Sequence, residues 1–305
     1  MLRAYIQGRT DGAWRFFKRG APVSKKVKIV TDSTIDLPKE VIEQLDVTIV
    51  PLSVTINGES YLDGVEITSK EFVNQLVQSE DIPKSSQPSV GSFLEVYDRL
   101  GADGSEVLSI HMTSGMSGTY AAAKTAADMS DSNVTVVDSK YISLALSFQV
   151  REACDMAASG ETVDAIVARL EVIRNNTSLY IMVDTLEYLV KGGRIGRGKA
   201  LVGSLLKIKP VASLQDGVYT PVTKVRSYMQ MIKFLTKKFE EETSDKIVKG
   251  IGIAQVEARD LANQVKDALK ELTSFKDISL VDTTPIISTH TGPGAIALMY
   301  YTDER

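Results

Sequence analysis

Cysteine and histidine are scarce in this chain of 305 residues, which contains one cysteine and two histidines. Cys154 has no second cysteine with which to form an internal disulfide. One thiol and two imidazoles are also too few ligands for a structural zinc site. The sequence therefore predicts a fold that is held together without disulfides and without a metal.

Long hydrophobic runs and an excess of basic charge are absent as well. No segment approaches the roughly 18 to 20 apolar residues needed to cross a bilayer, so we expect no transmembrane segment. The chain has 35 Lys and Arg against 39 Asp and Glu, which gives a formal net charge of −4. This balance argues against a nucleic acid or an anionic membrane surface as a partner. We expect a cytoplasmic protein.

Residues 1–24 differ from the rest of the chain. They contain five basic residues and a single acidic one, Asp11, and their apolar residues follow no regular period. The hydrophobic region of a signal peptide is missing. We expect this segment to be an N-terminal extension outside the fold.

Two patterns of apolar residues divide the remaining chain, whose length predicts two domains at about 100 to 200 residues each. Short β-branched runs alternate with helical patterns up to residue 159. This alternation predicts an N-terminal parallel α/β domain over 25–160. Residues 161–305 lack the alternation and predict a mixed α+β domain, with a boundary near Ser159-Gly160-Glu161.

Turn and cap signals predict finer features. Asn57-Gly58 predicts a hairpin, and residues 215–217 predict a second one. Asp36 is expected to cap a helix that has Pro38 in its first turn. The excursion at 52–85 is compatible with packing on either domain.

The densest polar signal is a cluster of hydroxyl residues and glycines at 112–119, between a predicted strand and a predicted helix. Hydroxyls and free backbone N–H groups at a helix N-terminus attract an anion such as a carboxylate. Ordinary helix capping by Ser114 or Ser117 is the alternative. A nucleophile elbow is a weaker one, because Thr119 stands where that motif requires glycine.

A second hydroxyl cluster at 84–89 is interpreted as a loop, because Pro88 disfavours helix at Gln87. The two histidines differ in setting. His111 lies within an apolar strand and is interpreted as a core residue. His290 is followed by Gly292 and is expected to lie in a tight polar loop, where its imidazole would bind a carboxylate and shift toward the cation.

The segment at 193–200 comes close to a phosphate-binding loop, but Ala200 stands where the magnesium-binding hydroxyl is required. We therefore do not expect nucleotide binding there. The segment is strongly basic, with Lys191, Arg194, Arg197 and Lys199. It is either a solvated run of charge or a docking surface for a partner that handles phosphate.

Taken together, these segments resemble the DegV family of bacterial fatty-acid-binding proteins. The resemblance extends from about Lys26 to Tyr301 and is carried by seven segments in order: 30–34, 85–89, 114–119, 137–139, 191–195, 206–210 and 290–294. It implies a two-domain α/β fold with one long-chain fatty acid in a tunnel between the domains. It also implies a separate fatty acid kinase that phosphorylates the bound carboxylate for phospholipid synthesis.

Carried over by position, the resemblance implies a carrier with no catalytic residue and no cofactor. Transient contact with a membrane is compatible with such a carrier, although we expect no transmembrane segment. The implied carboxylate-binding residues are Ser85, Ser86, Ser114, Ser117 and His290, with Ser114 as the chief hydroxyl of its cluster. The implied supporting residues are Asp32, Ser33, Thr113 and Thr289. Arg194 is expected to face the kinase and not to affect lipid affinity, and Ser85 stands where the family more often has threonine.

Two other functions remain compatible with the same residues. One is a serine hydrolase that acts on lipid esters through Ser114 or Ser117 with His290. The other is a regulatory protein for which the lipid is only a stabilising ligand.

Overall fold

The computed structural model describes residues 26–79, 82–201 and 208–305. The predicted extension at 1–24 lies outside these ranges, as do Leu206 and Lys207 of one motif of the family resemblance. Within the described ranges, no helix is long and apolar enough to cross a membrane.

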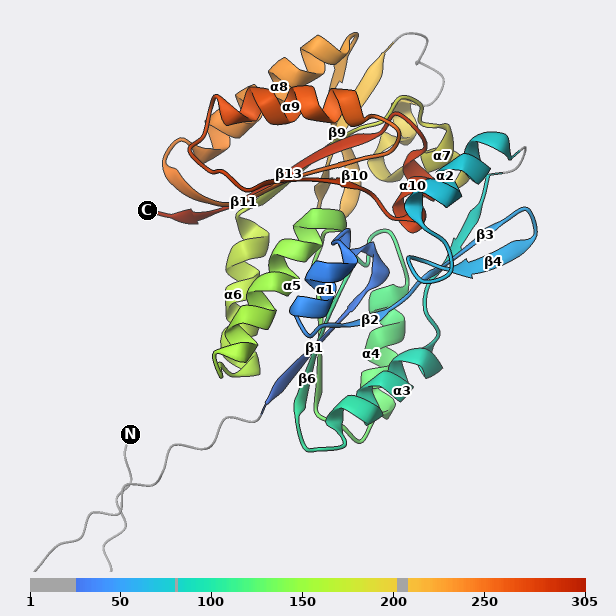
Figure 1. The fold of residues 1–305 in the computed structure, drawn as a ribbon, viewed down its shortest axis with the longest axis vertical. Coiled ribbons are helices and arrows are strands. Elements are labelled where there is room, and N and C mark those ends of the chain that lie inside the picture. Colours follow the sequence, from blue (N-terminus) through green and yellow to red (C-terminus); the bar gives the residue numbers. More distant parts are fainter. Residues whose placement is uncertain (1–25, 80–81, 202–207) are drawn as a thin grey trace, which may run out of the picture.

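The first half of the chain forms a parallel sheet of four strands in the order β2-β1-β6-β7 (Figure 1). The strands are β1 (Val27–Asp32), β2 (Thr48–Val50), β6 (Glu106–His111) and β7 (Val134–Asp138). Helices α3 (Val90–Gly101) and α4 (Thr119–Met129) cover one face, and α5 (Ser143–Ala158) packs on the other. The predicted parallel α/β architecture is confirmed.

The second half forms a mixed sheet of six strands in the order β10-β9-β8-β13-β11-β12. The strands are β8 (Thr177–Met182), β9 (Lys209–Gln215), β10 (Val218–Val225), β11 (Lys246–Gln255), β12 (Ile278–Asp282) and β13 (Ile296–Glu304). Helices α8 (Tyr228–Thr243) and α9 (Arg259–Lys270) cover the outer face, and α6 (Val163–Asn175) packs against α5 and β13 on the inner side. The predicted mixed α+β character is confirmed. The boundary near residue 160 stays a prediction, although no strand is shared by the two sheets.

A third, small sheet with the order β4-β3-β5 comes from the excursion at 52–85. It contains β3 (Ser53–Ile56), β4 (Glu59–Leu62) and β5 (Lys84–Ser86), and the predicted hairpin at Asn57-Gly58 joins the first two. The sequence predicts a loop at residues 84–86, but they form a strand because their backbone pairs with β3. This sheet and α2 (Ser69–Gln78) contact α10 (Pro285–Thr291).

The remaining elements are short. They are η1 (Ser33–Ile35), α1 (Lys39–Gln44), α7 (Glu187–Lys191) and η2 (Gly196–Leu201).

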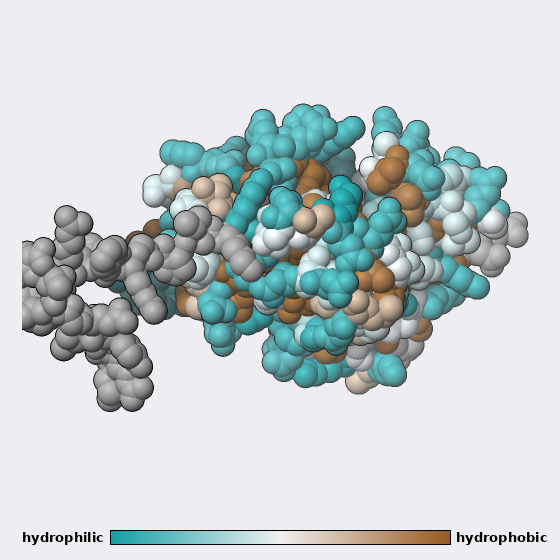
Figure 2. Space-filling model, turned by 90° about the horizontal axis from the view of Figure 1, so that it is seen from below, coloured by the Kyte–Doolittle hydropathy of each residue, from teal (hydrophilic) through white to brown (hydrophobic). Residues whose placement is uncertain are grey.

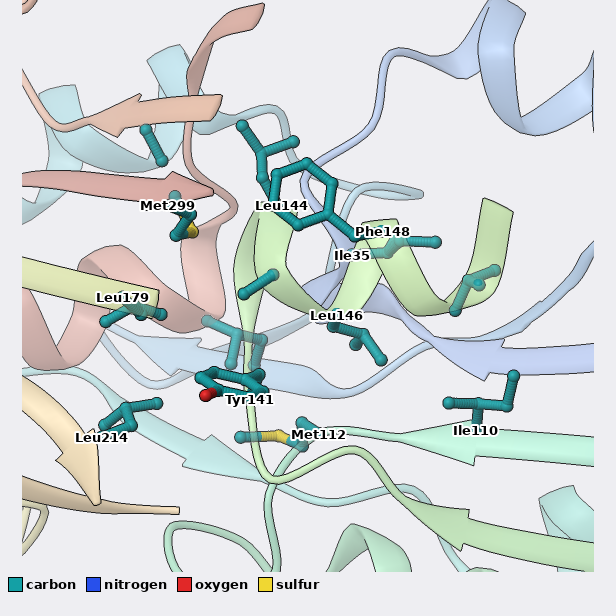
Figure 3. Packing of buried hydrophobic residues seen from close by; sticks show 14 of the residues in the cluster. Ile35, Ile110, Met112, Tyr141, Leu144, Leu146, Phe148, Leu179, Leu214 and Met299 are labelled. Carbon is teal, nitrogen blue, oxygen red and sulfur yellow. The ribbon is translucent and has the colours of Figure 1, made fainter. Parts of the chain in front are cut away.

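The core of the molecule is shared by the two large sheets, with α5 between them. Leu144 and Phe148 of α5 lie between Ile110 of β6 and Met299 of β13 in one continuous cluster of buried side chains (Figure 3). The first half of α5 is therefore buried on all sides, from Ser143 to Val150, and the charged residues Arg151, Glu152 and Asp155 appear only in its second half. Seen from below in Figure 2, the surface is largely hydrophilic with separate hydrophobic spots.

Two further local predictions were wrong. Asp36 does not cap the helix that follows it in the chain. It adopts a left-handed backbone conformation (φ 51°), and its buried carboxylate accepts hydrogen bonds from Ser143 and Thr283, while α1 begins after Pro38 without a side-chain cap. His290 does not lie in a loop but in the last turn of α10, and the loop begins only at Gly292.

The interpretation of His111 as a core residue is confirmed. Its Nδ1 lies 3.1 Å from the carboxylate of Asp32, and its Nε2 lies 2.7 Å from Ser109 Oγ, which also accepts a hydrogen bond from Tyr97. All of these side chains are buried. Burial alone would raise the pKa of Asp32, but the hydrogen bond and the charge interaction with His111 hold it below its usual value.

The two halves also meet at the turn between β9 and β10. Thr113 Oγ1, in the loop after β6, donates a hydrogen bond of 3.0 Å to the carbonyl of Gly217. Gly217 has a φ of +77°, and a Cβ atom built there would overlap Thr113 Oγ1. The turn therefore requires glycine for both its conformation and its close contact with the other half.

We predict that Gly217→Ala destabilises the fold by more than Gly160→Ala does. Gly160 has nearly the same conformation (φ +82°) but nothing within 4 Å of the added methyl group, so it reports only the backbone strain of roughly 1 to 2 kcal/mol. Gly217→Ala adds the overlap with Thr113, which is expected to cost about a further 1 to 3 kcal/mol. Urea unfolding of both variants measures the difference. If both variants lowered the free energy of unfolding equally, the contact between Gly217 and Thr113 would not contribute to joining the two halves.

Candidate functional site

A cavity of about 330 Å³ lies among the loop after β6, the small sheet, the inner face of the six-stranded sheet and α10. Most of its wall is apolar: Leu52, Met112, Met116, Ile142, Leu179, Ile181, Leu189, Leu214, Tyr219, Ile286 and Ile287. Its polar wall consists of Ser85, Ser86, Gln87, Ser117, Arg194, His290 and Thr291. The volume lies within the range of about 300 to 1,000 Å³ that is typical of small-molecule sites.

A second, narrow space of about 30 Å³ adjoins the cavity and is lined by residues of β8, β11 and β13. The two spaces share Ile142, Leu179, Ile181, Ile287 and Thr291 in their walls. Small side chains line the narrow space, among them Ala254, Ala295 and Ala297. The two spaces are therefore neighbours with a largely apolar common wall, and Ser85, Arg194 and His290 line only the larger one.

Ser85 and His290 meet at the polar wall, although they are 205 residues apart in the chain. Ser85 Oγ lies 2.7 Å from His290 Nε2. Pairing of β5 with β3 fixes Ser85 opposite Val54, and α10 carries His290. A Cβ atom at Gly192 would overlap His290 Nδ1, so glycine at this position allows the end of α7 to approach the imidazole.

His290 is held in its neutral form. Burial lowers its pKa to about 4, and the positive charge of Arg194 contributes in the same direction. The shift toward the cation that the sequence predicts requires a carboxylate bound beside the imidazole, so it stays a prediction. Among the described residues, His290 Nδ1 is buried and has no hydrogen-bond partner.

Arg194 lies on the wall of this cavity. Its Nε donates to the carbonyl of Met116 at 3.1 Å, and its Nη1 donates to the carbonyl of Gly192 at 2.6 Å. The expectation that Arg194 acts in the kinase encounter and not in lipid affinity stays a prediction, and the structure adds that its side chain lines the cavity. Arg197 and Lys199, from the same basic segment, are exposed.

The hydroxyl cluster after β6 divides between the cavity and its surroundings. Ser117 lines the cavity, with its Oγ 2.8 Å from Thr119 Oγ1. Ser114, the expected chief hydroxyl, is exposed and donates a hydrogen bond of 2.6 Å to Asp138, so it is not part of the cavity wall. Thr113 is buried, and its hydroxyl donates the hydrogen bond to the carbonyl of Gly217 described above.

The expected supporting residues are buried behind the wall. Met112 donates its backbone N–H to Asp32 at 2.8 Å, and Leu52 donates its backbone N–H to Ser33 Oγ at 3.1 Å. Both acceptors thus fix residues that line the cavity. Thr289 has a different position, because its hydroxyl donates to the carbonyl of Pro285 within α10.

Sequence reasoning did not single out Gln87 or Thr291 as site residues, and both line the cavity. For Thr291 the indication is its place in α10, where the sequence predicts a loop. In a helix, residues 287, 290 and 291 share one face, and all three line the cavity. For Gln87 the structure alone gives the indication: its side chain lies against Gly118, where a Cβ atom would overlap it.

A larger cleft of about 690 Å³ lies on the other side of α10, where Ser288 is part of its wall. Six of its seventeen lining residues are charged: Lys70, Asp184, Glu257, Arg259, Asp260 and Asp282. Such a wall favours an alkyl chain less than the largely apolar wall of the smaller cavity does. In the part of the chain that the structure describes, no group of three or more His, Cys, Asp or Glu side chains is placed to hold a metal ion.

Comparisons with known proteins agree with this geometry. The family model described as "Uncharacterised protein, DegV family" matches residues 26–303. A DegV domain-containing protein of Staphylococcus aureus is 43% identical over 271 residues, which cover 89% of this chain and 97% of that protein.

Two solved structures are also similar. A DegV family protein from Thermus thermophilus, whose structure is described by its fatty acid binding, matches with a TM-score of 0.86 and 31% identity over 91% of this chain and 100% of that one. A stearic-acid-binding protein from Eubacterium ventriosum matches with a TM-score of 0.79 and 29% identity over 90% of this chain and 98% of that one.

We predict that His290 titrates near pH 4 in the ligand-free protein. Because the chain has two histidines, NMR of the ring protons resolves this titration once one variant assigns the signals. Arg194→Gln is expected to raise the pKa of His290 by removing a nearby positive charge. The folded-state pKa lies below the unfolded value of 6.5, so this group stabilises the fold above pH 6.5 and loses that contribution as the pH falls toward 4. Titration near 6.5 would contradict the placement of His290.

Proposed function

The chain belongs to the DegV family, and we propose that it binds one long-chain fatty acid in the cavity between its two large sheets. The observation that carries the proposal is the separation of polarity in this cavity, whose apolar interior ends at Ser85, Ser117, Arg194 and His290. The alkyl chain would occupy the interior and the carboxylate would lie at the polar wall.

The alkyl chain would supply most of the affinity. Burying about fifteen methylenes at roughly 0.8 kcal/mol each gives a gross driving force on the order of 12 kcal/mol, before the costs of association are subtracted. The narrow space beside the cavity, lined by residues of β8, β11 and β13, adds further apolar wall next to the site proposed for the tail. Affinity from the tail does not depend on the identity of the head group.

The polar wall would determine the orientation of the ligand. A buried carboxylate without partners is unfavourable by many kcal/mol, whereas hydrogen bonds to a charged group recover about 1.5 to 3 kcal/mol each. The hydroxyls of Ser85 and Ser117 would donate to the carboxylate, and Arg194 would supply a positive charge. A carboxylate beside His290 would also raise the pKa of the imidazole from its low value.

We further propose that the protein is a carrier and not an enzyme, and that a separate fatty acid kinase phosphorylates the bound carboxylate. The kinase would transfer the terminal phosphoryl group of ATP to a carboxylate oxygen, giving an acyl phosphate for phospholipid synthesis and ADP. Arg194 lines the cavity, and the exposed Arg197 and Lys199 follow it in the same basic segment, so this segment would act on both the ligand and the encounter with the kinase.

The geometry favours this carrier over a serine hydrolase. Ser85 and His290 are in contact, but an imidazole with a pKa of about 4 is a weak general base. The Nδ1 atom of His290 also has no acidic partner within the described residues to orient the ring. A second histidine, His111, does have an acidic partner, Asp32, and also contacts Ser109, but all three side chains are fully buried. A fluorophosphonate probe tests the alternative, since a covalent adduct at any of these serines would favour hydrolysis.

We predict that solvent extraction of purified native protein followed by mass spectrometry yields close to one fatty acid per chain. Ser85→Ala and His290→Ala are expected to weaken retention by about tenfold or more, the effect of losing one hydrogen bond to a charged group. Ser114→Ala is the matched control, because this hydroxyl bonds to Asp138 outside the cavity and its loss should leave retention unchanged. A lipid-free native extract would count against the proposal.

We predict different effects for two arginines of the basic segment. Arg194→Gln is expected to weaken both fatty acid retention and phosphorylation by the kinase, because its guanidinium lines the cavity. Arg197→Gln is expected to leave retention intact and to reduce only lipid-dependent ATP use, because its side chain is exposed. If the kinase consumed no ATP with the lipid-loaded wild-type protein, a regulatory role for the lipid would be the better explanation.

A further inference from the structure

The helix that carries His290 is attached at its start to the first half of the chain. The backbone N–H of Thr284, which precedes α10, donates to Asp36 Oδ1 at 2.9 Å. The hydroxyl of Thr283 donates to Asp36 Oδ2 at 2.6 Å. The backbone N–H of Ile286 donates to Asp63 Oδ1 at 3.3 Å. Two acidic side chains from the first half thus receive the donors at the start of this helix.

Helix α10 makes no side-chain cap of its own. Its N-cap residue Thr284 forms no capping hydrogen bond, and Pro285 has no backbone N–H to satisfy. Carboxylates at this end also interact favourably with the partial positive charge of the helix dipole. Asp36 and Asp63 therefore do the work of an N-cap from positions more than two hundred residues earlier in the chain.

Both acids are fixed within the first half of the molecule. Asp36 is 4% exposed and also accepts a hydrogen bond from Ser143, the first residue of α5. Asp63 is 1% exposed, and its backbone N–H donates to the carbonyl of Leu52, a residue of the cavity wall. The start of α10 is thereby tied to α5 and to the small sheet that carries Ser85.

A seven-residue helix transmits such an attachment to its other end. With a rise of about 1.5 Å per residue, His290 lies only about 9 Å along the axis from Thr284. The far end of α10 contacts α7, where Gly192 permits close approach to the imidazole. A shift at the start of the helix would therefore change the contact between His290 and Ser85.

We propose that Asp36 and Asp63 are positioning residues for the carboxylate site, which hold α10 so that His290 stays in register with Ser85. This role deepens the proposed fatty acid binding and rests on it. Burial raises the pKa of Asp36 to about 6 and that of Asp63 to about 7, while the hydrogen bonds from the start of α10 lower both. The acids and the helix thus stabilise each other.

The test compares three variants of the delipidated protein by NMR of the two histidine rings. Asp36→Asn and Asp63→Asn are expected to shift the His290 signals and to leave those of His111 nearly unchanged. Tyr97→Phe is the matched control, since it removes a buried hydrogen bond to Ser109 beside His111, and Tyr97 lies in a different hydrophobic cluster from Ile286 of α10. It should shift His111 and leave His290 unchanged. Thr283→Val, which removes one donor to Asp36, provides a milder variant if Asp36→Asn does not fold.

Reloading the same variants with a fatty acid provides the second measurement. Asp36→Asn and Asp63→Asn are expected to lower the affinity roughly tenfold, equivalent to about 1.4 kcal/mol, and Tyr97→Phe to leave it unchanged. Unchanged His290 signals in the folded Asp36→Asn, Asp63→Asn and Thr283→Val variants would overturn the positioning role. Because the ring signals need no lipid, this result differs from a failure of the wild-type protein to bind fatty acid, which would overturn the proposed function itself.

Discussion

The shared hydrophobic core between the two large sheets is the constraint on which the remaining features depend. Helix α5 packs against β1 of one sheet and against β11 and β13 of the other, so neither sheet has a separate inner core. The cavity belongs to this shared core, since Met112, Ile181 and Ile286 line it and lie in or beside the same apolar cluster. An apolar ligand there would extend the contacts that already join the two halves.

The polar wall depends on hydrogen bonds and charge and not on apolar packing. Ser85 comes from the small sheet, Ser117 from the loop after β6, Arg194 from the segment after α7, and His290 from α10. Within the shared core, polar contacts also hold these elements, among them the hydrogen bonds from the start of α10 to Asp36 and Asp63. Burial keeps His290 neutral, so the positive charge at this wall comes from Arg194. The site combines neutral donors with one cation.

Local patterns predicted the elements that local physics controls. Strand and helix alternation, the hairpin at Asn57-Gly58 and the buried position of His111 all follow from neighbouring residues. The errors concern residues whose partners are distant in the chain. Asp36 is a residue type that often caps helices, yet its carboxylate accepts a hydrogen bond from Thr283. Residues 84–86 become a strand only through pairing with β3. Ser114 and Ser117 look equivalent in sequence, but Asp138 binds one of them outside the cavity.

The sequence by itself determined the α/β class, the order of the elements and, through its ordered segments, membership of the DegV family. These properties depend on short-range periodicity and on the identity of residues. Only the tertiary structure decided which hydroxyls reach the cavity, that Arg194 lines it, and that His290 is neutral. The reason is that burial, charge proximity and hydrogen-bond geometry depend on contacts such as the one between Ser85 and His290, which the fold creates between residues far apart in the chain.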